Sequence, residues 1–220
     1  MLKLNFLGDS ITEGANASRL EKQYVYRVGE ILNAEVRNYG ISGSRIAKQK
    51  EPSADPRYDL YFASRVDDMK NDADLVFVFG GTNDYGHGDA PIGSIFDKTA
   101  DTFYGALNLL IENLLKYYKK EQIAFILPLY RKDEDNPYGE GNKKTPGPSL
   151  KKYREIIKEV ASFNKIDILH FEEEIGTRET KPYISEDGLH PNDLGHEKIA
   201  QLIARYVKNK LNIYDTNRYY

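Results

Sequence analysis

Cysteine and tryptophan are both absent from this 220-residue sequence, and the lack of cysteine excludes several kinds of chemistry. Without a thiol the chain has no disulfide, no thiolate zinc site, no iron–sulfur cluster and no cysteine nucleophile. Any covalent catalysis therefore requires another side chain. A reducing compartment is compatible with this composition.

The sequence also lacks an excess of charge of one sign. The 31 Lys and Arg residues against 34 Asp and Glu residues give a formal net charge of −3, too close to neutral for the broad basic surface that nonspecific nucleic-acid binding requires. We therefore expect no nucleic-acid partner. Hydrophobic residues make up 40% of the chain and charged residues 30%, which predicts a globular protein with one sizeable core.

Long hydrophobic runs are missing as well. No segment approaches the roughly 20 apolar residues of a membrane span, and Lys3 and Asn5 interrupt the opening segment, so it lacks the apolar stretch of a signal peptide. We expect a cytoplasmic protein. No linker rich in Pro, Gly or Ser and no internal repeat divides the sequence, so we expect residues 1–220 to form a single domain.

Short apolar runs alternate with helical patterns, which predicts an α/β fold with crossover units around a parallel sheet. Five strands are expected, at residues 2–7, 34–38, 75–79, 123–127 and 166–169. Helices are expected at residues 21–32, 95–118, 150–163 and 193–210, with a weaker helical stretch at 61–69.

One long segment, residues 131–149, is rich in Pro, Gly and charged residues and predicts irregular structure. It follows a predicted strand, and ligands of open α/β sheets bind beyond the carboxyl ends of strands. Loops of this length in compact domains are commonly mobile or functional. We therefore weigh two alternatives, a solvated excursion and a flap over a site, and slightly favour the flap.

Polar and glycine residues follow three of the predicted strands. Gly8, Asp9 and Ser10 come after the first, the segment 38–43 after the second, and the segment 80–84 after the third. In a parallel sheet these segments converge, and they would bring together a hydroxyl, a flexible backbone amide and a side-chain amide donor. Such donors can stabilise the oxyanion that develops during acyl transfer. No Walker or Gly-x-Gly-x-x-Gly pattern supports phosphate binding instead.

An aspartate three residues before a histidine stands just before the last predicted helix, as Asp187 and His190. A serine hydroxyl becomes a good nucleophile when a histidine takes its proton, and a carboxylate on the other ring nitrogen orients that histidine. The alternative is a helix-entry turn in which Asp187 caps the backbone and His190 packs.

Taken together, these motifs resemble the GDSL or SGNH hydrolase family of serine esterases and lipases. The family carries four blocks, and this sequence supplies them in order as Gly8-Asp9-Ser10, Gly40, Gly81-Thr82-Asn83-Asp84 and Asp187-Gly188-Leu189-His190. The leucine of the family name is Ile11 here, an apolar exchange. The resemblance implies a flavodoxin-like three-layer α/β/α sandwich, with no cofactor and no metal.

The resemblance also implies roles for individual residues. Ser10 would be the nucleophile, His190 the general base and Asp187 the carboxylate that orients it. The backbone amides of Ser10 and Gly40 and the side-chain amide of Asn83 would form the oxyanion hole, and the remaining acidic residues of the motifs, Asp9 and Asp84, would support the loops. The α/β-hydrolase family is disfavoured, because Thr12 stands where its nucleophile elbow needs glycine.

Other residues near the strand ends are candidates for a substrate pocket. For each arginine among them, the alternative to a role in the pocket is a surface charge or an ion pair. The candidates are Arg45, Arg65, His87, Tyr130 and Arg131. His170 and His196 are expected to be structural, and no histidine spacing indicates a metal.

The expected activity is hydrolysis of carboxylic esters through an acyl-enzyme, with short-chain or acetyl esters of a small soluble molecule, such as an acetylated sugar, as substrates. A thioesterase or lysophospholipase of the same family is the alternative, and a catalytically silent binding module or a phosphate-binding flavodoxin-like protein is a remote one. A homo-oligomer is also considered. Three tyrosines near the C-terminus could dock on the body of the protein or on a neighbouring subunit, namely Tyr214, Tyr219 and Tyr220.

Overall fold

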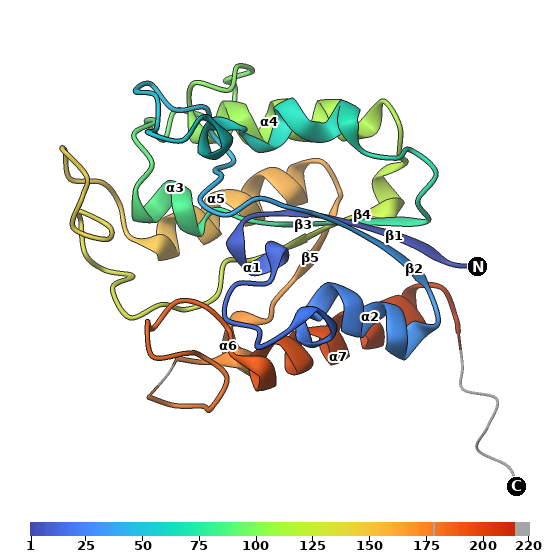
Figure 1. Ribbon diagram of the computed structural model, residues 1–220. Helices are drawn as coiled ribbons and strands as arrows, with labels where there is room; N and C mark the ends of the chain where they lie inside the picture. Colours follow the sequence, from blue (N-terminus) through green and yellow to red (C-terminus); the bar gives the residue numbers. More distant parts are fainter. Residues whose placement is uncertain (178, 214–220) are drawn as a thin grey trace, which may run out of the picture.

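A five-stranded, entirely parallel sheet forms the centre of the protein, as seen in the computed structural model, which describes residues 1–177 and 179–213 (Figure 1). The strand order is β2-β1-β3-β4-β5, the flavodoxin-like order. The strands lie within two residues of the expected positions: β1 (Lys3–Gly8), β2 (Glu35–Gly40), β3 (Leu75–Phe79), β4 (Ile123–Ile126) and β5 (Asp167–Leu169). Tyr214, Tyr219 and Tyr220 lie outside the described residues.

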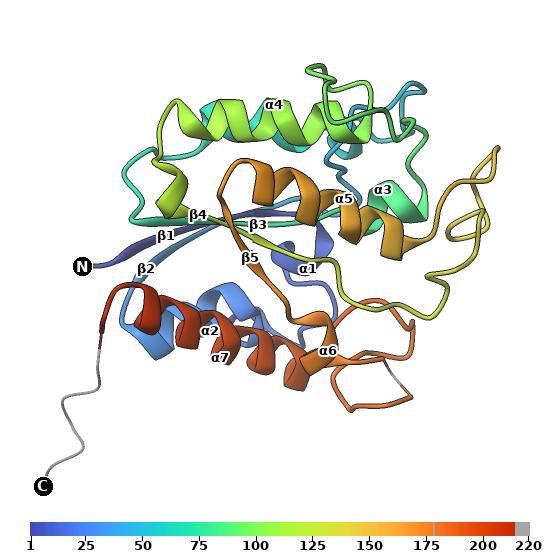
Figure 2. The ribbon, with the colours of Figure 1, turned by 180° about the vertical axis from the view of Figure 1, so that it is seen from behind.

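Helices cover both faces of the sheet and confirm the predicted three-layer α/β/α sandwich (Figures 1 and 2). One face carries α3 (Thr82–Gly86), α4 (Phe103–Leu115) and α5 (Leu150–Phe163). The opposite face carries the longer helices α2 (Tyr24–Leu32) and α7 (Asp193–Lys210) and the short helices α1 (Ser10–Glu13) and α6 (Glu172–Ile175). Among the described residues, no helix is both long and apolar enough to cross a membrane.

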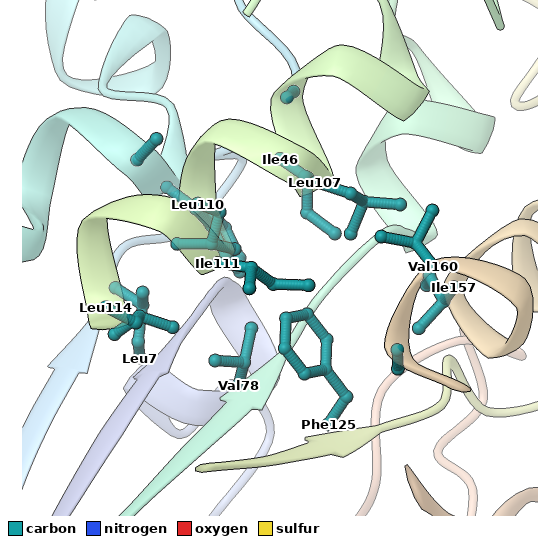
Figure 3. Close-up of a cluster of buried hydrophobic side chains, with 14 of the residues drawn as sticks. Leu7, Ile46, Val78, Leu107, Leu110, Ile111, Leu114, Phe125, Ile157 and Val160 are labelled. Carbon is teal, nitrogen blue, oxygen red and sulfur yellow. The ribbon is translucent and has the colours of Figure 1, made fainter. Parts of the chain in front are cut away.

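The central strand β3 is buried on both faces because its five residues are all apolar. Val76 and Val78 point to the face of α4 and α5, whereas Phe77 and Phe79 point to the face of α2 and α7. Figure 3 shows Val78 and Phe125 of the sheet packed under the α4 side chains Leu110 and Ile111. The period-two alternation of a strand thus supplies two separate cores, one on each side of the sheet.

The helix predicted for residues 95–118 is shorter than expected. Helix α4 begins at Phe103, because the Thr102 side chain accepts a hydrogen bond from the Gly105 amide and caps the helix. Asp97 in turn accepts hydrogen bonds from the Ser94 amide and the Thr102 hydroxyl, which holds the preceding residues in an ordered turn. The prediction missed this cap because the apolar spacing continues through it.

Two other expectations are refined. The weak helical stretch at 61–69 is a 3₁₀ helix, Phe62–Asp68. Residues 131–149 are irregular, as predicted, and pack on α3: the Tyr85 hydroxyl donates to the Asn136 carbonyl (3.0 Å), and the Glu140 amide donates to the Gly86 carbonyl (2.9 Å).

The carboxyl ends of the strands mark the functional edge of the sheet. Strand β2 lies on one side of β1 in the sheet, and β3 lies on the other side. The direction in which strands are added therefore reverses between β1 and β3. Ligands of open α/β sheets bind at such a switch point. Helix α1 follows β1 and α3 follows β3, so Ser10 and Asn83 both lie at this point.

Candidate active site

Ser10 begins the four-residue helix α1 directly beyond β1, and the residue is mostly buried, at 7% exposure. Asp9 caps this helix by accepting a hydrogen bond from the Ile11 amide (3.0 Å). The turn also needs Gly8, because a Cβ there would lie 2.8 Å from the Phe79 carbonyl oxygen and within 2 Å of the Thr12 hydroxyl. The strand, glycine and cap together fix the direction of the Ser10 side chain.

A chain of hydrogen bonds joins Ser10 to the other end of the sequence. The Ser10 Oγ lies 2.9 Å from Nε2 of His190, and Nδ1 of the same ring lies 2.8 Å from Oδ2 of Asp187. Both residues come from the loop between α6 and α7, which lies on the same side of the molecule as α1 and α3 (Figure 1). The structure therefore brings together the three residues that the sequence motifs singled out.

The Asp187 carboxylate is held in its charged form. Its partial burial acts to raise the pKa, but hydrogen bonds from the Leu189 amide, the His190 ring and the His190 amide outweigh this and lower the pKa of Asp187. An ionised carboxylate accepts, so Nδ1 of His190 carries the proton. The other nitrogen, Nε2, is then free to accept from the Ser10 hydroxyl.

Sequence reasoning missed Asn16, which also contacts Asp187. Its side-chain amide donates to Oδ2 of Asp187 (2.8 Å), the same oxygen that faces the His190 ring. Asn16 has a φ of 63°, a left-handed conformation that asparagine tolerates better than most residues. The two residues are 171 positions apart, so no local pattern signals this contact.

The expected role of Gly40 is not compatible with its contacts. Its amide donates to the side-chain oxygen of Asn38 (2.8 Å), so this amide is already engaged. Instead, Gly40 lets α1 approach β2: a Cβ at this position would lie 2.2 Å from the Glu13 amide nitrogen and 2.6 Å from the Thr12 carbonyl carbon. Gly40 is required by close backbone packing, which explains the glycine without an oxyanion role.

The turn that follows, residues 41–44, presents a different amide. The Ile41 amide donates to the Gly8 carbonyl (3.1 Å), which fixes the turn at the end of β1. Gly43 has a φ of 72°, and within the described residues neither its amide nor that of Ser10 has a hydrogen-bond acceptor. The signal in the sequence was a second glycine three positions after Gly40.

Asn83 and Asp84 lie in α3, where both are buried. The Asn83 side-chain amide donates to the Ser44 carbonyl (2.9 Å), which uses one of its two N–H groups and leaves the other for a ligand. The Asp84 carboxylate accepts from the amides of Ile46 (2.9 Å) and Ala47 (2.8 Å). These bonds hold the loop after β2 against α3.

The two buried aspartates have perturbed pKa values. Burial raises the pKa of Asp9 to about 7, with a further contribution from the negative charge of Asp84. Burial likewise raises the pKa of Asp84 to about 6, against the opposing effect of its two backbone hydrogen bonds. The charged guanidinium of Arg65, which donates to the Gly8 carbonyl (3.1 Å), partly offsets the penalty at Asp9.

The pocket candidates separate into two groups. Arg45 and His87 contact each other, with 2.8 Å between Nη1 and Nδ1, and both line a cavity beside α3. Arg131 is buried and forms ion pairs with Asp133 (2.6 Å) and Glu140 (3.1 Å), which anchors the segment 131–149. Tyr130 lies outside the cavity, with the Arg154 guanidinium 4.7 Å above its ring.

The histidines outside the motifs have structural contacts. His196 is fully buried; its Nε2 lies 3.0 Å from the Ala15 carbonyl, and its Nδ1 accepts from the Tyr24 amide. Burial lowers the pKa of His196, which keeps the ring neutral. His170 lies 3.3 Å from Glu172. In the described part of the chain, no group of three His, Asp or Glu side chains is arranged to hold a metal ion.

Residues 6–198 match the GDSL-like Lipase/Acylhydrolase family, which covers most of the chain. The protein belongs to this family. The match spans all four sequence blocks, from Ser10 to His190, and agrees with the predicted resemblance. No curated protein matches the sequence.

Several solved structures are similar in fold to this protein. A Lactobacillus plantarum protein shares 29% identity over 94% of this chain and 97% of its own, with a TM-score of 0.76. A lipase/acylhydrolase from Enterococcus faecalis shares 22% identity over 96% of this chain and 97% of its own (TM-score 0.67). A carbohydrate acetylesterase from Sinorhizobium meliloti shares 18% identity over 95% and 99% (TM-score 0.69). For the two structures below 25% identity, the likeness shows a shared fold and nothing more.

The raised pKa of Asp9 predicts a pH-dependent stability difference. The folded protein keeps a proton on Asp9 up to a pH of about 7, whereas an ordinary aspartate loses it near 3.8, so the stabilisation from Asp9 is complete below 3.8 and is lost as the pH rises toward 7. Asp9→Asn removes this titration and keeps a good helix cap. Urea unfolding should therefore show the variant gaining stability relative to wild type between pH 4.5 and pH 8.

The control is Asp101→Asn, which removes the same charge from an exposed position. Its stability difference from wild type should change less with pH than that of Asp9→Asn. A difference between Asp9→Asn and wild type that stays constant over this pH range would contradict the assignment.

Proposed function

We propose that this protein is a serine hydrolase that cleaves carboxylic esters through an acyl-enzyme, with Ser10 as the nucleophile. One observation carries the proposal: Ser10 Oγ, the His190 ring and the Asp187 carboxylate form a continuous hydrogen-bonded chain with contacts of 2.9 and 2.8 Å. This arrangement supplies a hydroxyl, a base to take its proton and a carboxylate to orient the base.

The first step follows from the protonation of His190. Since Nδ1 donates to Asp187, Nε2 accepts the Ser10 proton as Oγ attacks the carbonyl carbon of the ester. The imidazolium that forms lies beside the Asp187 carboxylate, which stabilises its charge. Nε2 then gives this proton to the ester oxygen of the leaving alcohol, the bond between the acyl carbon and that oxygen breaks as the carbonyl re-forms, and the alcohol leaves.

The negative charge on the carbonyl oxygen requires nearby donors. We assign this role to the amides of Ser10 and Gly43, which have no acceptor among the described residues, and to the second N–H of the Asn83 side chain. Gly43 replaces Gly40 in this assignment, because the Gly40 amide is bonded to Asn38. Loss of one such donor typically costs about 3–4 kcal/mol of transition-state stabilisation.

The second half of the reaction reuses the same groups. Water gives a proton to Nε2 of His190 and attacks the acyl carbon on Ser10, and Nε2 returns the proton to Oγ as the carboxylic acid leaves. The reaction needs only these protein groups and water. Asp187 keeps its charge throughout, since its hydrogen bonds lower its pKa.

For the substrate we propose a short-chain or acetyl ester of a small soluble molecule, such as an acetylated sugar. The mean hydropathy of −0.63 supports this, because a lipase that works at a lipid surface needs an extended apolar face. The structural likeness to a carbohydrate acetylesterase is consistent with the proposal.

The nucleophile assignment is tested with Ser10→Ala. Removal of Oγ should lower kcat for a short-chain nitrophenyl ester by about 10⁴- to 10⁶-fold and abolish covalent labelling by a fluorophosphonate. Ser162→Ala, at an exposed serine of α5, is the matched control and should retain both. Labelling of the Ser10→Ala protein would refute the assignment.

The substrate class is tested with a series of nitrophenyl esters that differ in acyl length. We expect kcat/KM to be highest for acetyl or butyryl esters and to fall sharply toward acyl chains of about ten carbons, because a mean hydropathy of −0.63 does not favour the extended apolar surface that long chains need. A rate that rises with chain length would instead indicate a lysophospholipase or lipase.

Asn16 is tested with Asn16→Gly, which keeps the left-handed backbone and removes only the side-chain contact with Asp187. Because this carboxylate is partly exposed, we expect a modest loss, about three- to tenfold in kcat with little change in KM. Asn33→Gly makes the same change at another left-handed asparagine, at the end of α2, and should leave kcat unchanged. Equal kcat values for the two variants would contradict the positioning role.

A further inference from the structure

A cavity of about 640 Å³ opens beside α3, between three loops. Residues 49–53, 87–92 and 142–148 line it, together with Arg45 and Tyr153. Its volume lies in the range of small-molecule sites, about 300–1,000 Å³. Ser10, Asp187 and His190 do not line the cavity, so it is not the site of the proposed ester cleavage.

Lys143, from the irregular segment 131–149, brings a positive charge into this cavity. Its ammonium group donates to the Asp84 carbonyl (3.0 Å) and lies 5.5 Å from the centre of the Tyr153 ring. Among the described residues no carboxylate forms an ion pair with it. Burial lowers the pKa of Lys143, as expected for a cation that is partly removed from water and has no direct counter-ion.

His87 adds a neutral hydrogen-bond donor. Arginine only donates, so the contact between Arg45 Nη1 and His87 Nδ1 makes Nδ1 the acceptor and places the ring proton on Nε2. Within the described residues Nε2 has no partner. Burial lowers the pKa of His87 to about 4, helped by the positive charges of Arg45, Arg131 and Lys143 and opposed by the negative charge of Glu140, so the ring keeps this form at neutral pH.

The carboxylates near the cavity are already engaged. Asp89 accepts from the amides of Lys50 and Glu51 (both 2.9 Å), and Glu51 pairs with Lys144. Asp84 holds the Ile46 and Ala47 amides, and Asp59 pairs with Arg45 (3.1 Å). Among the described residues, the groups beside the cavity that keep an unused donor are therefore Lys143, which bonds to the Asp84 carbonyl and the Tyr153 hydroxyl, His87, and Arg45, whose buried Nε has no partner.

We propose that this cavity binds a small molecule through a carboxylate or phosphate group, which pairs with Lys143 and accepts a hydrogen bond from His87 Nε2. A charged acceptor satisfies both donors at once, and charge-assisted hydrogen bonds are the stronger kind. The anion is either part of the ester substrate or a separate ligand. The first case rests on the proposed esterase function, whereas the second does not.

The cavity is connected to the candidate active site through Asn83. Arg45 follows Ser44, whose carbonyl accepts from the Asn83 side chain, and Lys143 donates to the carbonyl of Asp84, the neighbour of Asn83 in α3. A ligand in the cavity thus contacts Arg45, which is next in sequence to the hydrogen-bond partner of Asn83, and Lys143, which bonds to the residue next to Asn83. This connection allows either source of the anion to affect turnover.

The substrate case is tested with two acetyl esters, 4-acetoxybenzoate and its neutral methyl ester. Lys143→Gln removes the charge and keeps a donor, Lys143→Arg keeps the charge, and Lys151→Gln, at an exposed lysine of α5, is the matched control. We expect Lys143→Gln to lower the ratio of kcat/KM for the anionic over the neutral ester about tenfold relative to wild type. Lys143→Arg and Lys151→Gln should keep the wild-type ratio.

The separate-ligand case is tested without turnover, by calorimetric titration of the same four proteins with benzoate and with inorganic phosphate. Binding of either anion to wild type that weakens about tenfold in Lys143→Gln, but not in Lys143→Arg or Lys151→Gln, supports it. The thermal midpoint of each variant without ligand shows whether it folds.

The two tests together decide the proposal. An effect of Lys143→Gln on the ester ratio assigns the anion to the substrate, and an effect confined to the titration assigns it to a separate ligand. If neither the ester ratio nor the titration distinguishes Lys143→Gln from Lys151→Gln, the proposal is wrong. If Ser10→Ala keeps its activity or its labelling, the proposed esterase function fails. The titration can still be interpreted in that case, because it does not depend on turnover.

Discussion

The close packing of α1 on β2 determines most of the candidate site. At Gly40 the backbone of Thr12 and Glu13 occupies the space where a Cβ would lie, so the helix that carries Ser10 rests directly on the strand. Asn38 reinforces the contact, because its side-chain amide donates to the Thr12 carbonyl (2.7 Å) while its oxygen accepts from Gly40. Ser10 therefore emerges at a fixed angle, and we propose Gly43 of the neighbouring turn, and not Gly40, as the amide donor.

A second set of contacts joins the two ends of the sequence. The segment between α1 and α2 bonds to the start of α7 and to the loop before it: the Ser18 amide and hydroxyl donate to Asp193 (2.8 and 2.7 Å), His196 contacts the Ala15 carbonyl, and Asn16 donates to Asp187. Because His196 is buried and neutral, its contact with the Ala15 carbonyl does not depend on a surface charge, whereas the bonds to Asp193 and Asp187 use charged carboxylates. It holds the Asp187 and His190 loop against the helix that carries Ser10.

The sequence predicted the sheet well, because uninterrupted apolar runs such as Leu75–Phe79 have few alternatives to a buried strand. The bounds of α5 and α7 were also predicted, since each follows a clear break at Pro148 or Pro191. The four- and five-residue helices α1 and α3 were missed, because such short segments show no periodicity. The roles of Gly40 and Asn16 could not be predicted from local sequence patterns. The role of Gly40 depends on the close approach of two backbone segments, and that of Asn16 on a contact with a residue 171 positions away.

The same long sequence separation bears on biosynthesis. The contact between Ser10 and His190 joins residues 180 positions apart, so it forms only after most of the chain has been translated. The first helix and its serine leave the ribosome early, yet the imidazole that would activate the hydroxyl is still to be made. On the proposed mechanism, a nascent chain therefore carries a serine without its base, and Ser10 gains that base only when the loop between α6 and α7 docks beside α1.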